Sequence, residues 1–189
     1  MRTLFLVCSF FIATISTAQA ATVNVVPSTS VVYLNDIFSV LVSATDFPET
    51  GGANLDLRFD PSVVQVSGIF LATGSPFEAI SASAINNVAG EVPSIAVLAP
   101  LTGLLPSGSF DAFRVDFYGV GLGTANIRLF EDGVQKGWFG ADDALISGIT
   151  YNQANVAVTQ PVPLPAAAWL LLSGLGVLVS SGRFARRRG

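Results

Sequence analysis

Apolar and polar residues alternate with a period of two through the middle of this chain, and this pattern limits what the chain can fold into. In residues 55–59 two leucines and a phenylalanine alternate with aspartate and arginine, and residues 113–117 show the same alternation. Successive side chains of a β-strand point to opposite faces, so each such segment has one apolar face. No stretch between residues 21 and 159 shows a sustained helical period. The chain is therefore predicted to be all-β.

Short strands separated by turns account for the whole middle of the chain. Glycine, proline, asparagine and aspartate cluster between the alternating segments, for example at residues 48–52, 74–76 and 106–108. About nine strands at this spacing, without intervening helices, favour two antiparallel sheets packed face to face. The predicted strands cover residues 23–26, 30–34, 37–44, 55–59, 63–70, 94–98, 113–117, 127–129 and 155–159.

The composition excludes several classes of function. The chain has no histidine and a single cysteine, Cys8. Nucleophilic triads, imidazole bases and histidine-ligated zinc sites are therefore ruled out. Between residues 21 and 160 there are four basic and thirteen acidic residues, which gives this body a net charge of −9. Such a body has no basic stripe for phosphates, so the sequence predicts neither an enzyme nor a nucleic-acid-binding protein.

Residues 1–20 have the three-part pattern of a secretory signal peptide. One arginine precedes an apolar run over residues 4–15, and a polar stretch with small residues follows. The alternative is an uncleaved membrane helix, but the apolar run is shorter than the ~20 residues of a membrane span. Cleavage would remove the cysteine and leave a chain that no disulfide can stabilise. The residues expected to be recognised and cleaved by signal peptidase are Ala18, Ala20 and Ala21.

An apolar stretch followed by arginines closes the chain. Residues 166–181 are almost wholly apolar and would form about 24 Å of helix, so one transmembrane helix is predicted at about residues 166–182. The basic tail, residues 183–189, favours the cytoplasmic side and places everything before residue 161 outside the cytoplasm. The alternative is a buried C-terminal helix of a soluble domain. The arginines of the tail are Arg183, Arg186, Arg187 and Arg188.

A short proline motif precedes the apolar stretch, and it consists of Val162, Pro163, Leu164, Pro165 and Ala166. The order of motif, apolar helix and arginine cluster over residues 161–189 resembles the PEP-CTERM sorting signal in its VPLPA variant. The resemblance implies processing by an exosortase, a membrane protease-transferase of Gram-negative bacteria. The protein would cross the inner membrane, be anchored there by one C-terminal helix, and then reach the cell surface or extracellular matrix. Leucine stands where the commoner motif has glutamate.

Two stretches in the first half of the body have a recognisable order of residues. Residues 35–40 read NDIFSV at a strand entry, and residues 53–66 read ANLDLRFDPSVVQV, a strand, an Asp-Pro turn and a second strand. With the later segments 113–130 and 149–158, they resemble the layout of cohesin-like modules. The resemblance covers nearly all of residues 22–159 and implies a jelly-roll sandwich, related in shape to several carbohydrate-binding modules. Asn35 replaces the usual glycine of the pattern, a change that a turn tolerates.

The resemblance implies that residues 21–160 form a non-enzymatic binding module. By analogy with the family, noncovalent binding of polysaccharide is expected. The alternative is protein–protein adhesion of the kind by which cohesins capture dockerin partners, whereas a hydrolase is disfavoured because the usual acid–base residues are missing. An exposed aromatic strip would favour a sugar, and a flat apolar sheet face would favour a protein.

Residues 131–143 are acidic and aromatic and form the main candidate for a ligand site. Trp138 and Phe139 are suited to stacking on a sugar ring or to anchoring a protein partner, and the alternative is that they plug one end of the core. Four carboxylates in this stretch are candidates for binding Ca²⁺, although their spacing matches no EF-hand loop, and the alternative is a solvated loop. No other cofactor is predicted. The calcium candidates are Glu131, Asp132, Asp142 and Asp143.

Three other features are interpreted as structural. The Asp60-Pro61 pair suits a turn in which the carboxylate accepts backbone N–H groups. The glycine-rich residues 119–123 join two strands and lack the helix N-terminus of a phosphate-binding loop. Asp56 and Asp60 are four residues apart on one strand face, about 13 Å at ~3.3 Å per residue, which is too far for a catalytic carboxylate pair. Both are expected to be solvated.

Overall fold

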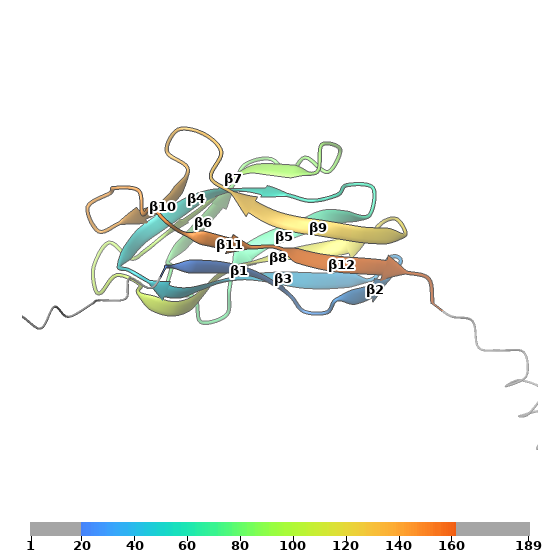
Figure 1. Ribbon diagram of the computed structural model, residues 1–189, viewed down its shortest axis with the longest axis horizontal. Helices are drawn as coiled ribbons and strands as arrows, with labels where there is room; N and C mark the ends of the chain where they lie inside the picture. Colours follow the sequence, from blue (N-terminus) through green and yellow to red (C-terminus); the bar gives the residue numbers. More distant parts are fainter. Residues whose placement is uncertain (1–19, 162–189) are drawn as a thin grey trace, which may run out of the picture.

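The alternating segments form strands in a computed structural model of the protein, which describes residues 20–161 (Figure 1). Within these residues the structure is all-β, without a helix, and twelve strands follow one another along the chain. They are β1 (Thr22–Pro27), β2 (Val31–Tyr33), β3 (Ile37–Phe47), β4 (Thr50–Arg58), β5 (Val64–Leu71), β6 (Ala79–Ala82), β7 (Glu91–Leu98), β8 (Gly108–Gly119), β9 (Gly123–Phe130), β10 (Gly137–Gly140), β11 (Thr150–Asn152) and β12 (Ala154–Thr159).

Two sheets pack face to face and give a jelly-roll-like sandwich (Figure 1). The smaller sheet has the strand order β11-β1-β3-β8-β5, and the larger sheet has the path β2-β12-β9-β4-β7-β6. The remaining strand, β10, pairs with the first half of β4, whereas β9 pairs with the second half. Between β11 and β12 the chain crosses from the smaller sheet to the larger one at Gln153.

The core lies between the sheets and is built by alternate residues of each strand, as the period of two predicts. In β3 every second residue from Phe38 to Ala44 is buried, and the residues between them are only half-buried. In β8, Phe113, Val115 and Phe117 alternate in the same way with half-buried polar residues. Burying a large apolar side chain contributes about 1.5–3 kcal/mol, so the core supplies the main stabilisation. Its largest fully buried members include Trp138, Phe113, Phe117, Leu55, Leu57, Ile95 and Ile127.

The prediction of about nine strands is wrong in number, because all nine are present but three further strands were not recognised. The missed strands are β6, β10 and β11. The first and last of these lie at sheet edges and have few buried residues, so they show no apolar alternation. β10 reads Gly-Trp-Phe-Gly and forms by pairing with β4. Strand formation at such short segments depends on a distant partner strand more than on local propensity.

The structure confirms the turns at Asn35 and Asp60-Pro61 and within residues 119–123, whereas residues 50–52 of the turn predicted at 48–52 belong to β4. Asn35 has a φ of +70°, a left-handed conformation that asparagine adopts more readily than most side chains. Asp60 Oδ1 accepts the backbone N–H of Ser62 at 3.0 Å and the Ser62 hydroxyl at 2.6 Å. The glycine-rich residues 119–123 contain the connection between β8 and β9.

The predicted signal peptide and sorting signal lie outside the described residues, except for Ala20 and Ala21 at the start of the sandwich. The motif at residues 162–166, the apolar stretch and the arginine tail are all in the part that is not described. Among residues 20–161, no helix is long and apolar enough to cross a membrane.

Candidate functional site

The outer face of the larger sheet carries a row of apolar residues at the end where β10 lies. Strand register places Ala79 opposite Leu98, Leu98 opposite Gly52, Gly52 opposite Phe139, and Phe139 opposite Leu145. Paired residues in neighbouring strands share a face. Leu98 is 59 % exposed and Leu145 is 53 % exposed, whereas Phe139 is half-buried and Gly52 is buried. We call these five residues the apolar row.

Most of the side chains beside the apolar row are small. The next outward-facing residues along the strands are Ser81, Ala96, Asn54 and Gly137, which lie opposite one another in register. Gly52 itself has no room for a side chain, since a Cβ there would lie 2.4 Å from the carbonyl oxygen of Val97. We call the part of the sheet between Leu98 and Leu145, with these small side chains, the platform.

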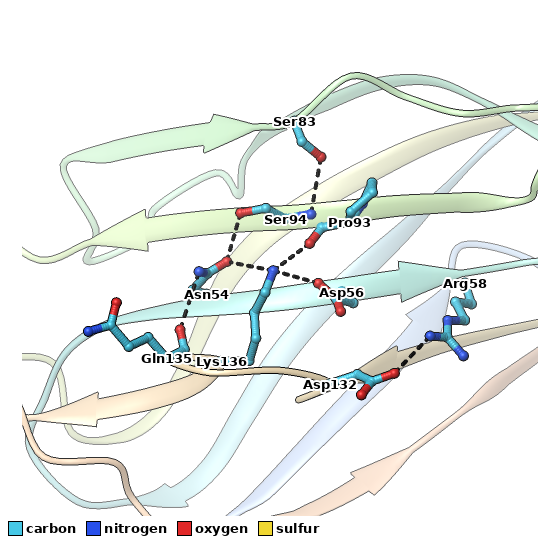
Figure 2. Close-up of polar contacts among 9 residues, drawn as sticks. All are labelled: Asn54, Asp56, Arg58, Ser83, Pro93, Ser94, Asp132, Gln135 and Lys136. Atoms are coloured by element: carbon cyan, nitrogen blue, oxygen red, sulfur yellow. Dashed lines mark hydrogen bonds and ion pairs between the residues drawn. The ribbon is translucent and has the colours of Figure 1, made fainter.

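A buried ion pair stands next to this platform (Figure 2). Lys136 Nζ donates to Asp56 Oδ1 at 2.7 Å, and it also donates to the carbonyl oxygen of Pro93. Asn54 Oδ1 lies 3.4 Å from the same ammonium and accepts the Ser94 hydroxyl at 2.8 Å. The side chains of Lys136 and Asp56 are only 15 % and 12 % exposed. The ammonium is thus enclosed by acceptors from β4 and β7.

The ion pair fixes the connection between β9 and β10 against the sheet. Asn54 Nδ2 donates to the carbonyl oxygen of Gln135 at 3.3 Å, next to Lys136. At the other end of the connection, Arg58 forms an exposed ion pair with Asp132 at 3.0 Å (Figure 2). Both ends of the segment 131–136 are therefore tied to β4, and this holds β10 and Phe139 in place beside the apolar row.

The expectation that Asp56 is solvated is wrong. The Asp56 side chain lies on the outer face of the sheet, as the alternation predicts. However, the segment 131–136 covers that position, and Lys136 pairs with the carboxylate. A buried carboxylate needs such a partner, because an unpaired charge is costly away from water. Asp60, in contrast, serves the turn described above.

The two aromatic candidates for sugar stacking lie on opposite sides of the larger sheet. Trp138 is fully buried and packs against Phe47, Phe110 and Phe77, with ring centroids 4.7, 6.0 and 6.1 Å away. The stacking prediction is therefore wrong for Trp138, and the alternative, a plug at one end of the core, is what the structure has. Phe139 points outward and belongs to the apolar row.

The four calcium candidates do not converge. Glu131 accepts the Tyr151 hydroxyl, Asp132 pairs with Arg58, and Asp142 Oδ1 accepts the N–H of Ala144 within its own turn. Asp143 has a φ of +58° in that turn. Among residues 20–161, no group of three or more Asp, Glu, Cys or His side chains is placed to hold a metal ion.

Sequence reasoning missed the main members of the site. Leu98 was placed in a strand, but its outward direction and its neighbours depend on the register with β4 and β6. Leu145 lies outside the named strands and joins the row through an isolated bridge. One signal was available for Lys136, since it is one of only four basic residues in an acidic body.

Solved structures show which known fold this is. No protein-family model matches the chain, and no curated protein matches it in sequence. The third cohesin of ScaC from Acetivibrio cellulolyticus, solved in complex with the ScaB dockerin, has a TM-score of 0.58 and 18 % identity. The match covers 73 % of this chain and 98 % of that one.

Two further similar structures are cohesins from other sources. A non-cellulosomal cohesin from the archaeon Archaeoglobus fulgidus has a TM-score of 0.59 and 12 % identity, over 75 % of this chain and 93 % of that one. The cohesin module of a Clostridium perfringens family 33 glycoside hydrolase has a TM-score of 0.59 and 12 % identity, over 75 % and 97 % of the two chains. Identities this low show the fold alone, and the described residues have the cohesin fold.

Proposed function

We propose that residues 21–160 form a non-enzymatic module that binds a protein partner through the outer face of the larger sheet. The observation that carries this proposal is the apolar row, in which Leu98 and Leu145 are exposed, beside a sheet segment that the buried ion pair holds in place. Contiguous apolar surface rimmed by polar groups is typical of protein interfaces. The enclosed Lys136–Asp56 pair keeps the platform in one geometry, which lowers the entropy cost of binding.

The comparisons support a protein as the ligand class. A similar cohesin was solved in complex with a dockerin, a protein partner. The missing histidine and the separation of the carboxylates support a role without catalysis. The second candidate function is binding of polysaccharide at this face. Only Phe139 of the two aromatic candidates could stack on a sugar there, because Trp138 is buried.

Leu98 provides the test of this surface. A photo-crosslinking amino acid at position 98 of the full chain, in the native cells, is expected to give a covalent adduct with one protein. Position 122 is the matched control, because Leu122 is exposed to a similar degree, 54 %, but lies in the β8–β9 turn. Leu98→Asp is expected to weaken binding of that purified partner by about tenfold or more, since it places a charge at the centre of an apolar contact.

Leu122→Asp should leave the affinity unchanged within about twofold. Equal loss in both variants, or equal crosslinking from both positions, would contradict the proposed face. Retention of a polysaccharide by the unmodified protein, with no protein adduct at position 98, would instead favour the polysaccharide candidate.

We further propose that the module is exported and displayed outside the inner membrane of a Gram-negative bacterium. The signal-peptide pattern, the VPLPA motif at residues 162–166 and the arginine tail support this route. In this proposal signal peptidase removes residues 1–20, and an exosortase processes the C-terminal segment while one apolar helix anchors it in the membrane.

The termini of the native protein test the export proposal. Mass spectrometry of material from native cells is expected to find Ala21 at the N-terminus and to find no peptide that contains Arg183 or later residues. Deletion of the exosortase is expected to restore the arginine tail. An intact tail in most of the wild-type protein would contradict processing, and a retained leader would contradict export.

A further inference from the structure

A cavity of about 420 Å³ opens where the two sheets meet beside β9. Its origin is the crossing of the chain between β11 and β12. β12 covers β9 only as far as the pair Ala154–Ile127, while β9 continues along β4 to the pair Phe130–Asp56. The side of β9 over residues 128–130 that faces away from β4 is therefore not covered by β12. We call this space the seam cavity.

One wall of the seam cavity carries a cation without a carboxylate partner. Four basic residues lie within residues 20–161, and three of them pair with carboxylates: Arg58 with Asp132 at 3.0 Å, Arg114 with Asp116 at 2.9 Å, and Lys136 with Asp56 at 2.7 Å. Arg128, which lines the cavity, has no ion pair among the described residues. Its guanidinium lies 4.6 Å from the centre of the Phe130 ring and is otherwise exposed.

The rest of the rim is rich in hydrogen-bond acceptors. Asn152 Nδ2 donates to Asn24 Oδ1 at 2.8 Å, which leaves the Asn152 side-chain oxygen free to accept. Gln153 is exposed and has no side-chain hydrogen bond within residues 20–161. Glu131 accepts the Tyr151 hydroxyl through Oε1 and retains a second oxygen. Acceptors of this kind match a ligand that carries several hydroxyl groups.

Half-buried aromatic rings supply the apolar part of the wall. Tyr151 and Phe130 both line the cavity. Burial, together with the hydrogen bond to Glu131 and its negative charge, raises the pKa of the Tyr151 hydroxyl. The phenol therefore stays protonated and donates to Glu131 at the cavity edge.

We propose that the seam cavity binds a saccharide unit that carries a carboxylate group. Arg128 pairs with the ligand carboxylate, and the oxygens of Asn152, Gln153 and Glu131 accept its hydroxyl groups. The apolar face of the sugar ring lies against Tyr151. Arginine suits this role because its planar fork matches a carboxylate. The cavity volume lies within the ~300–1,000 Å³ of typical small-ligand sites.

Other anions fit these residues less well. A phosphate or a simple carboxylate offers few or no donors to the acceptor oxygens of the rim, and these would lose their bonds to water without replacement. A neutral sugar would supply the hydroxyl groups but would leave Arg128 without a partner. The proposal does not depend on the protein-binding face, because the seam cavity and the apolar row share no residue.

Matched pairs of sugars test the proposal. The probes are methyl glucuronide and methyl glucoside, with the corresponding galacto and manno pairs, each pair differing only in the carboxylate. Each is titrated into full-length, isotope-labelled protein in a detergent without a sugar headgroup, and the backbone N–H signals of residues 151–153 are followed by NMR. In at least one pair the uronide is expected to bind about tenfold more tightly than the neutral sugar, which is the effect of one bidentate, charge-assisted contact between arginine and a carboxylate.

Arg58 and Arg128 both lie over the Phe130 ring, so substitutions of these two residues provide a matched control. Arg128→Gln is expected to abolish the preference for the uronide, whereas Arg58→Gln is expected to retain it, because Arg58 also lies over Phe130, at 4.8 Å, but does not line the cavity. Gln153→Ala, which removes no side-chain hydrogen bond within the described residues, is expected to weaken binding of both sugars of the pair by about threefold. Thermal melting confirms that each variant is folded.

Several results would overturn the proposal. Equal affinity for the uronide and the neutral sugar would contradict the role of Arg128. Binding of acetate as tight as that of the uronide would contradict a saccharide as the ligand. Signal changes that persist unchanged in Arg128→Gln, or the absence of signal changes with all three pairs, would show that the seam cavity is not a site for such sugars.

Discussion

Replacing Trp138 with alanine is expected to lower the free energy of unfolding by about 4 kcal/mol, the typical cost of removing a large buried aromatic side chain. The indole is fully buried and lies at the centre of a cluster with Phe47, Phe77 and Phe110. Its removal leaves a cavity that the two sheets cannot close without moving apart. Chemical denaturation, followed by circular dichroism, measures the difference from the wild-type protein.

Trp138→Phe and Phe139→Ala are the matched controls for this prediction. Phenylalanine keeps an aromatic ring in the cluster and removes only part of the buried volume. We therefore expect it to cost about 1–2 kcal/mol. Phe139 lies next in the chain but points outward, and Phe139→Ala is expected to cost less than about 1 kcal/mol. Equal losses for Trp138→Ala and Phe139→Ala would contradict the inward direction of the indole.

Replacing Asp56 with alanine is expected to destabilise the fold by about 3 kcal/mol, because it leaves the Lys136 ammonium enclosed without its carboxylate. Both side chains are more than four-fifths buried, so water screens the pair little. The loss should be accompanied by release of the segment 131–136 and of β10 from the sheet, since Lys136 fastens this segment to β4. Hydrogen exchange of the β10 amides, measured alongside the denaturation curve, reports this release.

Two comparisons separate the ion pair from other effects of the substitution. Asp132→Ala breaks the exposed pair with Arg58 in the same segment and is expected to cost less than about 1 kcal/mol. The double variant Asp56→Leu with Lys136→Met replaces both charges by apolar groups and is expected to recover most of the stability. If Asp56→Ala costs no more than Asp132→Ala, the pair does not secure the segment.

These two predictions also bear on the proposed function. The ion pair and the tryptophan hold β10 from opposite faces of the larger sheet, and Phe139 in β10 completes the apolar row. A variant with the pair broken is therefore expected to lose both stability and partner binding. Leu98→Asp, in contrast, is expected to change binding without a large change in stability, since Leu98 is more than half exposed.

Much of the sandwich could be predicted from the sequence because the signals for it are local. Nine strands, the Asp60 turn and the left-handed Asn35 all depend on residues within a few positions of one another. The alternation also predicts that Trp138 and Phe139 point to opposite faces once the segment is a strand. It does not predict which of the two faces the core, because that choice depends on the register of β10 with β4.

The sequence by itself therefore determined the fold class, the main strands and the exclusion of histidine-based chemistry. The tertiary structure alone decided which residues meet on one surface. Leu98 and Leu145 are 47 positions apart in the chain, and Asp56 and Lys136 are 80 apart, so their contacts depend on the pairing of distant strands. The same holds for the seam cavity, which exists because β12 stops short of the end of β9. Side-chain alternation is a property of each strand, whereas register and strand order are properties of the assembled sheets.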